Sequence, residues 1–284
     1  SLRRDDPLAA GRIFHSADAL DFAAWRGQRI GVLGAGASAF DNAACALEAG
    51  AQVDLFARRP ILPQVNKSKW TAFAGFFRGY EGLDDARKWR FYTYIFDEQV
   101  PPPWETVRRC DAQPGFTLRL GTPWLDVQPQ ANGVLVATPA GSEHYDAVVF
   151  GTGFDVDLLD RPELARYSAH IDTWADHVTP AQAARHPEAA RFPHLGPGFE
   201  LRPKGEAHAT ALRNLHLFNW GSTMSHGALA GDIPGLAVGA ARLAQAIARD
   251  LFVADADAHW ERLQALEEPE LLATRRYVPP EERS

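Results

Sequence analysis

The pattern of apolar and polar positions first becomes regular at residues 29–33, where a short apolar run is typical of a buried parallel strand. The following Ala-rich stretch, 37–49, has apolar residues at helical spacing and predicts a helix that ends at Gly50. A second apolar run at 52–57 predicts the next strand. This succession of strand, helix and strand predicts a βαβ unit, and therefore a parallel sheet.

The pattern changes in segment 61–112, where aromatic residues are concentrated and three consecutive prolines interrupt the chain at 101–103. Prolines and irregular apolar spacing favour short helices and loops, inserted after the second strand. Most of the aromatic rings in this insertion are expected to pack in a core, because large rings bury more apolar area than most side chains.

Alternating patterns return after the insertion. Candidate strands at 116–120, 124–127 and 133–138 predict an antiparallel meander, and Asn132-Gly133 gives a hairpin-turn signal before the third strand. Residues 145–150 predict one further buried strand. This strand leads into a Gly-Thr-Gly turn, and such turns allow the backbone to approach a ligand closely.

The last part of the chain is expected to be mostly irregular over 156–212, followed by an apolar strand at 214–219. A long Ala-rich helix is expected at about 234–252, with Asp232 as its N-cap, and another amphipathic helix from about residue 257.

Composition and charge exclude several classes of protein. Of the 284 residues, 46% are hydrophobic, which permits a substantial core. The formal net charge of −7 argues against a nucleic-acid or anionic-membrane partner. Cys45 and Cys110 lie far apart in the sequence, so a disulfide framework and a CxxC motif are excluded.

The sequence also bears on the location of the protein and on metal binding. The apolar runs are too short to span a bilayer and no signal peptide is visible, so we expect a cytoplasmic protein without a membrane partner. The ten histidines show no HxxxH or HxxEH spacing, so no metal site is expected.

The turn after the first strand carries the most informative motif, Gly-x-Gly-x-x-Ala. Gly34 allows the tight turn, Gly36 lets the backbone approach a pyrophosphate, and Ala39 keeps the helix close to the sheet. The phosphates would lie on the helix N-terminus, where free N–H groups and the helix dipole favour negative charge. The residues expected to bind the nucleotide here are Gly34, Gly36, Ala37, Ser38 and Ala39.

The end of the second strand distinguishes between nicotinamide cofactors. NAD-binding units place an acid there to bind the ribose 2′-hydroxyl, whereas this chain has Arg58 and Arg59. A guanidinium matches a 2′-phosphate, so we expect NADPH. Asp54 lies earlier, inside the strand, where it is poorly placed to reach the ribose. A basic turn that binds no nucleotide remains the alternative.

Several stretches occur in an order that resembles one known family. They are residues 11–16, 34–39 with Arg58, 146–154, and 214–221 with His226 beyond. They are similar, in order, to the FxGxxxH segment, the NADPH site, the D-x-(apolar)-A-T-G-(F/Y) segment and the C-terminal strand and loop of the flavin-containing monooxygenases. The related FAD- and NADPH-dependent N-hydroxylases and Baeyer–Villiger monooxygenases share this order.

The resemblance implies an α/β fold. It would consist of a Rossmann-like NADPH-binding domain with an antiparallel meander, plus the C-terminal part of a second, FAD-binding dinucleotide domain. The implied boundaries are 1–27 for a linker or the end of the FAD domain, 28–145 for the NADPH domain and 146–284 for the rest. The family's first GxGxxG, which binds the FAD diphosphate, has no counterpart upstream, so we expect the N-terminal FAD-binding segment to be absent.

The resemblance also implies a function. NADPH would reduce FAD, and a C4a-(hydro)peroxyflavin formed with dioxygen would oxygenate a small organic substrate. The flavin supplies this chemistry, so no catalytic side chain is required. Further cofactor-binding residues implied by the resemblance are Gly151, Thr152, Gly153 and His226.

One alternative function stays open, an NADPH-binding module or flavin-independent fragment without oxygenase activity. A short-chain reductase is excluded because the chain has no Tyr-x-x-x-Lys, and a disulfide reductase because it has no cysteine pair. The sequence permits a homo-oligomer and does not identify the substrate.

Overall fold

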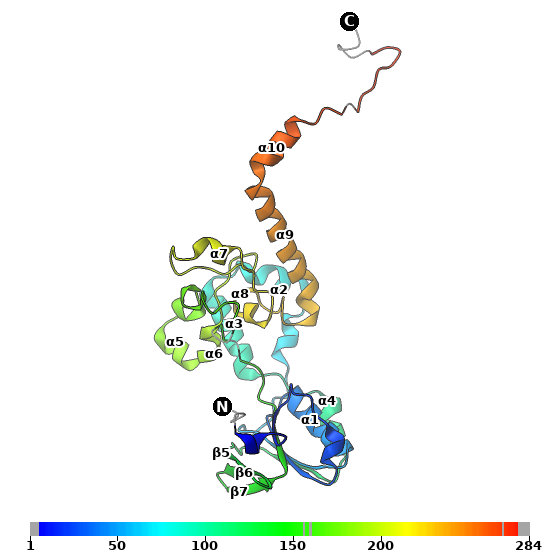
Figure 1. The fold of residues 1–284 in the computed structure, drawn as a ribbon, viewed down its shortest axis with the longest axis vertical. Coiled ribbons are helices and arrows are strands. Elements are labelled where there is room, and N and C mark those ends of the chain that lie inside the picture. The colour runs from blue at the N-terminus through cyan, green and yellow to red at the C-terminus, as the bar shows by residue number, and fades with distance from the viewer. Residues whose placement is uncertain (1–5, 156, 159–160, 269, 278–284) are drawn as a thin grey trace.

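A computed structural model describes residues 6–155, 157–158, 161–268 and 270–277. The elements form two packed groups, and a helix projects from one of them (Figure 1). The first group, called the sheet unit below, contains both β-sheets together with α1 and α4. The second, called the helical unit, contains α2, α3 and α5 to α8, and the projecting helix α9 starts from it.

A five-stranded parallel sheet is the centre of the sheet unit. Its strands, in spatial order, are β1 (Ile13–His15), β8 (Ala147–Phe150), β2 (Arg29–Leu33), β3 (Gln52–Phe56) and β4 (Phe116–Arg119). Every neighbouring pair is parallel. The prediction of a parallel βαβ unit is therefore confirmed. The order also shows that β1 and β8 belong to the same sheet as β2, although they lie outside the range 28–145.

Different elements cover the two faces of this sheet. Helices α1 (Ala37–Glu48) and α4 (Trp104–Asp111) pack on one face. The other face carries a three-stranded antiparallel meander, made of β5 (Asp126–Gln130), β6 (Gly133–Thr138) and β7 (Gly141–Tyr145). Alternation along β2 fits these two layers, because Ile30 and Val32 belong to the core under α1. Gly31 faces Trp124 and Tyr145 on the meander side.

Two strand predictions in the sheet unit were wrong. Residues 116–120 were expected in the meander, but β4 lies parallel to β3, because α4 carries the chain back over the sheet before β4 begins. Residues 145–150 were expected to be one strand. The structure divides them at Asp146, whose carboxylate accepts a hydrogen bond from the Arg29 backbone at 2.7 Å, so β7 and β8 enter different sheets.

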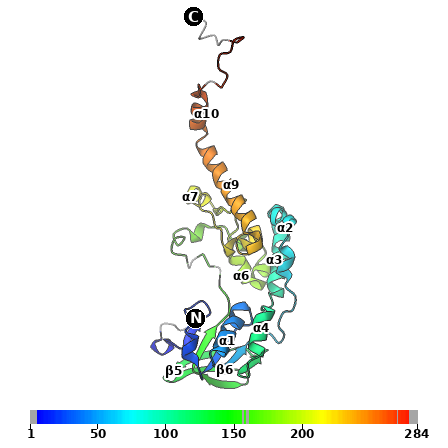
Figure 2. The same cartoon turned by 90° about the vertical axis from the view of Figure 1, so that its right-hand side faces the viewer.

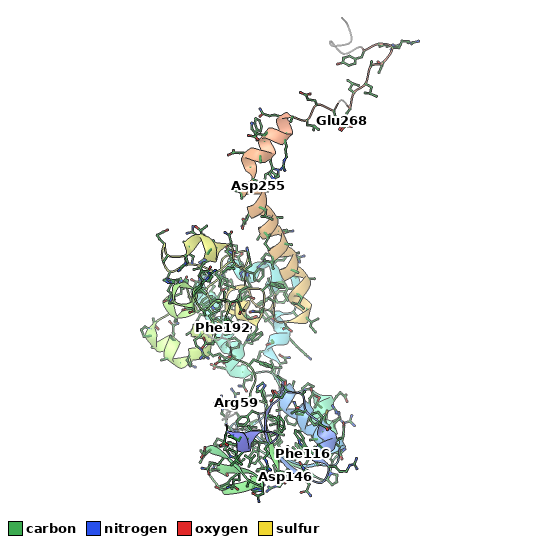
Figure 3. All side chains as sticks on the ribbon, viewed as in Figure 1. Arg59, Phe116, Asp146, Phe192, Asp255 and Glu268 are labelled. Carbon is green, nitrogen blue, oxygen red and sulfur yellow. The ribbon has the colours of Figure 1, made fainter. Side chains whose placement is uncertain are left out.

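The aromatic insertion folds into short helices, as predicted. They are η3 (Lys67–Thr71), α2 (Ala74–Gly79), η4 (Tyr80–Gly82), α3 (Asp85–Glu98) and then α4. The rest of the helical unit comes from later in the chain, with α5 (Pro180–Arg185), α6 (Pro187–Arg191), α7 (Ala209–Arg213), α8 (Thr223–His226) and η8 (Ile233–Gly235). Rings from both segments share one core around Phe192, labelled in Figure 3, and Trp174.

The segment 214–219 is not a strand. Its backbone pairs with residues 199–201 through Leu201 N–H to Leu215 O and Leu217 N–H to Phe199 O, and through one isolated bridge. This pairing is too short to form a ladder.

Helices α9 (Leu236–Ala254) and α10 (Ala256–Gln264) end the described fold, close to the ranges predicted. Figure 2 shows that the first turns of α9 lie against the helical unit and that its C-terminal half extends away from it. Asp232 does occupy the N-cap position of η8, but its side chain makes no capping hydrogen bond. Among the described residues, no helix is long and apolar enough to cross a membrane.

A polar network, buried at Asp54 and Tyr145, joins the two sheets. The Tyr145 hydroxyl of β7 donates a hydrogen bond to Asp54 of β3 at 2.8 Å. Arg29 of β2 forms ion pairs with both Asp54 and Glu143. Arg119 of β4 pairs with Glu143 at 2.6 Å. Because these contacts reach from three parallel strands to the meander, they fix how the two sheets stack.

We expect Tyr145→Phe to lower the free energy of unfolding by about 1 kcal/mol, since the variant keeps the ring but loses a buried hydrogen bond to a charged group. Urea denaturation would measure the change. Tyr94→Phe is the matched control, because Tyr94 is half exposed. Equal stability of the two variants would contradict a structural role for the Tyr145 hydroxyl.

Candidate nucleotide-binding site

The candidate site lies at the carboxyl ends of the parallel strands, where the turns after β2 and β8 meet. Gly34 has a φ of +128°, and a Cβ placed there would lie 2.2 Å from the carbonyl oxygen of Gly151. A Cβ on Gly151 would lie 2.7 Å from the Cβ of Ala39. Ala39 itself is fully buried. The two turns and the first turn of α1 are therefore in contact, and larger side chains would separate them.

The N-terminus of α1 is open at this edge. Gly36 is the N-cap residue of α1, and no side chain caps its free N–H groups. A Cβ at Gly36 would have no atom within 4 Å, and Ala37 and Ser38 are exposed. A helix end with free donors, a favourable dipole and open space in front of it suits the phosphates of a dinucleotide.

The two arginines after β3 differ in their surroundings. Arg59 donates a hydrogen bond to the carbonyl oxygen of Asp97 in α3 at 3.0 Å, and this contact ties the strand end to the insertion. No pattern in the sequence indicates this contact. Arg58 is exposed and makes no side-chain hydrogen bond or ion pair within the described ranges. Arg58 is therefore the arginine that is free to meet a ligand.

Asp54 is not available to a ribose. It is 6% exposed and accepts hydrogen bonds from Tyr145 and Arg29 on the meander side of the sheet. This placement agrees with the expectation that Asp54 lies too early in the strand to replace an acid at the strand end.

The turn after β8 carries Gly151, Thr152 and Gly153. Thr152 and Gly153 are exposed, and Gly153 has a φ of +85° with open space where a Cβ would lie. His15, at the end of β1, lies with Nε2 3.1 Å from the Gly153 carbonyl oxygen. The Phe154 ring packs edge-on against His15. The histidine of the FxGxxxH-like segment therefore holds the Gly-Thr-Gly turn in place.

His226 lies away from this edge, in the helical unit. Its side chain is buried, its ring stacks on Phe199 with centroids 4.0 Å apart, and Nε2–H donates to the Gly196 carbonyl oxygen at 2.9 Å. Arg242 lies 3.3 Å from Nδ1. Burial lowers the pKa of His226 to about 3, so the imidazole is neutral at physiological pH. A contact between His226 and a cofactor stays a prediction.

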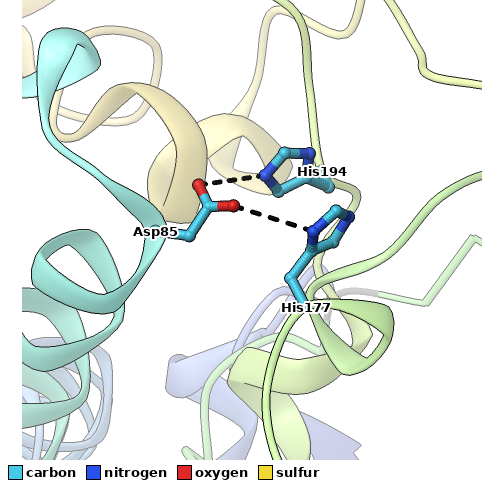
Figure 4. A group of neighbouring side chains, drawn as sticks. All are labelled: Asp85, His177 and His194. Carbon is cyan, nitrogen blue, oxygen red and sulfur yellow. Dashed lines mark hydrogen bonds and ion pairs between the residues drawn. The ribbon is translucent and has the colours of Figure 1, made fainter.

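Three polar side chains from separate segments form a second group: Asp85 begins α3, His177 precedes α5 and His194 follows α6 (Figure 4). The sequence pattern missed it because its members come from three separate segments. One Asp85 oxygen lies 3.2 Å from His194 Nε2 and the other lies 3.7 Å from His177 Nδ1. Asp172 contacts Nε2 of His177 at 2.7 Å.

The donor atoms of the three residues lie within 4.8 Å of one another, a spacing compatible with a metal ion. Two observations favour a hydrogen-bonded network instead. The two imidazole rings are stacked at an interplanar angle of 18°, so their nitrogen lone pairs do not converge on one point. The Arg202 guanidinium lies 3.2 Å from His194 Nδ1, which makes that nitrogen the acceptor and leaves Nε2–H to donate to Asp85. The network fastens the start of α3 to the later segment.

Comparison with known proteins agrees with this architecture. No protein-family model matches the chain. The FAD-dependent urate hydroxylase of Xanthomonas campestris pv. campestris is 39% identical over 266 residues, which cover 93% of this chain and 56% of that protein.

Solved structures show the same fold. The reduced form of ornithine hydroxylase (PvdA) from Pseudomonas aeruginosa aligns with a TM-score of 0.60 and 18% identity, over 88% of this chain and 59% of that one. A second structure of the same hydroxylase gives 0.54 and 15% identity, over 79% of this chain and 53% of that one. The chain thus spans little more than half the length of the relatives it matches.

The fold is that of the dinucleotide-binding α/β class. The 39% identity to the urate hydroxylase goes further and supports the resemblance to the FAD-dependent monooxygenases, although the chain covers 56% of that relative. The resemblance seen in the sequence is confirmed at this level.

The close approach of the two turns can be tested with a pair of glycine variants. We expect Gly151→Ala to lower the free energy of unfolding by about 1–3 kcal/mol, because its methyl group would overlap Ala39. Gly36→Ala is the matched control and should change stability little, since its Cβ meets open space and its φ is −89°. Thermal unfolding would measure both, and an unaffected Gly151→Ala would argue against the contact.

The buried His226 predicts a dependence of stability on pH. Its pKa is lowered to about 3 in the folded protein, whereas an unfolded histidine titrates near ~6.5. Above pH ~6.5 the imidazole is neutral in both the folded and the unfolded state. As the pH falls toward 3, the unfolded state binds a proton that the folded state does not. The free energy of unfolding therefore decreases by about 1.4 kcal/mol per pH unit. The lowered pKa of His194 acts in the same direction.

Urea unfolding at a series of pH values would measure this loss. In His226→Gln the stability should fall less steeply between pH 6 and pH 4 than in the unmodified protein. Parallel curves would show that His226 is not the group responsible.

Proposed function

We propose that this chain provides the NADPH-binding part, and a portion of the FAD-binding part, of an FAD- and NADPH-dependent monooxygenase. The reaction would oxygenate a small organic substrate with dioxygen. Urate, the substrate in the name of the Xanthomonas relative, is the first compound to test. The observation that carries the proposal is the open N-terminus of α1, enclosed by two touching glycine turns and placed beside an arginine that makes no ion pair within the described ranges.

For NADPH, the residues present fit the group. The backbone N–H groups at Ala37 and Ser38 would receive the pyrophosphate, and Gly36 leaves the space that the phosphate oxygens need. Arg58 would bind the 2′-phosphate through its guanidinium fork. Arg59 positions this strand end through Asp97, and its own contact with the nucleotide is also proposed.

For FAD, the exposed turn of Gly151, Thr152 and Gly153 offers backbone groups without obstruction by side chains. Residues 28–145, completed by β1 and β8 in the same sheet, would form the NADPH-binding domain. Apart from β1 and β8, residues 1–27 would lead from the FAD-binding domain and residues 146–284 would lead into it. The proposal also allows a homo-oligomer, which the sequence permits.

Bound flavin would accept electrons from NADPH and activate dioxygen, so the cofactor would supply the redox chemistry. The chain's own residues would bind and orient the cofactors. The α1 N-terminus holds the phosphates, the Gly34–Gly151 contact fixes the distance between the two turns, and His15 keeps the Gly153 carbonyl in place. None of these steps requires a side chain to transfer a proton.

The visible absorbance of the purified protein, recorded before and after anaerobic addition of NADPH, tests the proposal. We expect a flavin spectrum that bleaches with NADPH, followed by oxygen uptake when air is admitted. A colourless protein that still binds NADPH would favour the alternative of an NADPH-binding module without oxygenase activity.

The preference for NADPH over NADH is expected to depend on Arg58. Arg58→Ala should raise the Kd for NADPH about tenfold or more and leave that for NADH nearly unchanged, because only NADPH carries the 2′-phosphate. Quenching of tryptophan fluorescence on titration would measure both constants. Arg108→Ala, an exposed arginine on α4, is the matched control. Equal losses for the two nucleotides would remove the assignment of Arg58.

A further inference from the structure

A hollow of about 460 Å³ lies between α2 and the first half of α9, away from the glycine turns. Its volume falls in the range of small-molecule sites. The residues that line it are Arg78, Ala237, Val238, Ala241, Arg242 and Gln245. The lining therefore combines two guanidinium groups and one amide with an apolar wall, and it contains no acid.

The two arginines lack acidic partners. Arg242 is half-buried, and its guanidinium donates to two neutral acceptors, the Phe77 carbonyl oxygen at 3.1 Å and His226 Nδ1 at 3.3 Å. Burial lowers the pKa of Arg242, and Glu81 offsets this effect only from a distance. Arg78 is exposed, and within the described part of the chain neither arginine forms an ion pair with a carboxylate. A half-buried cation without a counter-ion is costly, and an anion would relieve that cost.

Charged groups of both signs lie around Lys88, which is close enough to Arg242 to feel its charge. The pKa of Lys88 in α3 is lowered by burial first, and by the charges of Arg202 and Arg242 as well. Asp85 and Glu81 raise the pKa of Lys88, each more strongly than either arginine lowers it, so burial is the reason that this pKa is low. The whole chain carries a net charge of −7, so the two arginines that line the hollow are a local positive feature of an acidic protein.

We propose that the hollow between α2 and α9 binds a small organic anion, with its carboxylate on Arg78 and Arg242 and its apolar body against Ala237, Val238 and Ala241. A planar carboxylate matches a guanidinium fork in two parallel hydrogen bonds. Gln245 offers an amide for a further polar group. None of these residues belongs to the proposed nucleotide site, so the proposal stands whether or not the proposed function is correct.

An inorganic oxyanion would satisfy the arginines but would leave the apolar wall unused. The wall is formed by two alanines and a valine, which contribute favourable contact area only with an apolar ligand. Contact with the apolar wall therefore distinguishes a carboxylate that has an apolar body from free phosphate, and the two kinds of anion are compared as probes.

Benzoate is the probe, and its binding is measured by isothermal titration or by NMR line broadening of the ligand. We expect benzoate to bind at least five times more tightly than acetate or inorganic phosphate, and at least ten times more tightly than benzamide, its neutral counterpart. Added KCl should weaken benzoate binding, since the interaction is between charges. Benzamide binding as tightly as benzoate, or phosphate binding as tightly as benzoate, would overturn the proposal.

Variants locate the site. Arg78→Gln should weaken benzoate about tenfold, and Val238→Asp should weaken it further, because it places a carboxylate beside the ligand. Arg213→Gln, an exposed arginine at the end of α7, is the matched control and should leave benzoate binding unchanged. Unchanged affinity in both Arg78→Gln and Val238→Asp, with the proteins folded by circular dichroism, would show that benzoate does not occupy this hollow.

Discussion

The contact among Gly34, Gly151 and Ala39 is the constraint on which the candidate site depends. A Cβ atom at Gly34 or at Gly151 would meet backbone or the Cβ of Ala39 at less than van der Waals distance. Because two strand ends and the first turn of α1 meet there, the free N–H groups of the helix are held at the sheet edge. The small residues Gly34, Gly151 and Ala39 let the strand ends and α1 approach closely, and Gly36 then faces open space.

The parts that could be predicted from the sequence are those that local pattern determines. The βαβ unit follows from apolar runs and glycines that lie within thirty residues or so of one another, and α9 follows from its Ala-rich periodicity. The position of β4 could not be predicted in this way, because short alternating strands look alike whether their neighbours are parallel or antiparallel. Asp146 ended a strand through a hydrogen bond with Arg29, a contact between residues 117 positions apart.

The candidate site shows the same division. The glycines and Arg58 were predicted from spacing alone and their role in binding stays a prediction, whereas the contact of Arg59 with Asp97 and that of His15 with Gly153 depend on tertiary packing. The Asp85, His177 and His194 network comes from three segments, so spacing along one segment could not show it. For His226, the sequence indicates a candidate residue, but its burial against Phe199 and Gly196 depends on the packing of the helical unit.

The uneven packing of the projecting helix α9 has a consequence for its local unfolding. Its buried residues are Gly239 and Ala246, while Leu251, Phe252 and Val253 near its end are each about 60% exposed or more. A helix gains most of its stability from packing, so the backbone hydrogen bonds of α9 have unequal support along its length. Amide hydrogens of α9 should therefore exchange with solvent along a gradient, slowly beside the helical unit and more rapidly toward Ala254, where α10 is the neighbouring element.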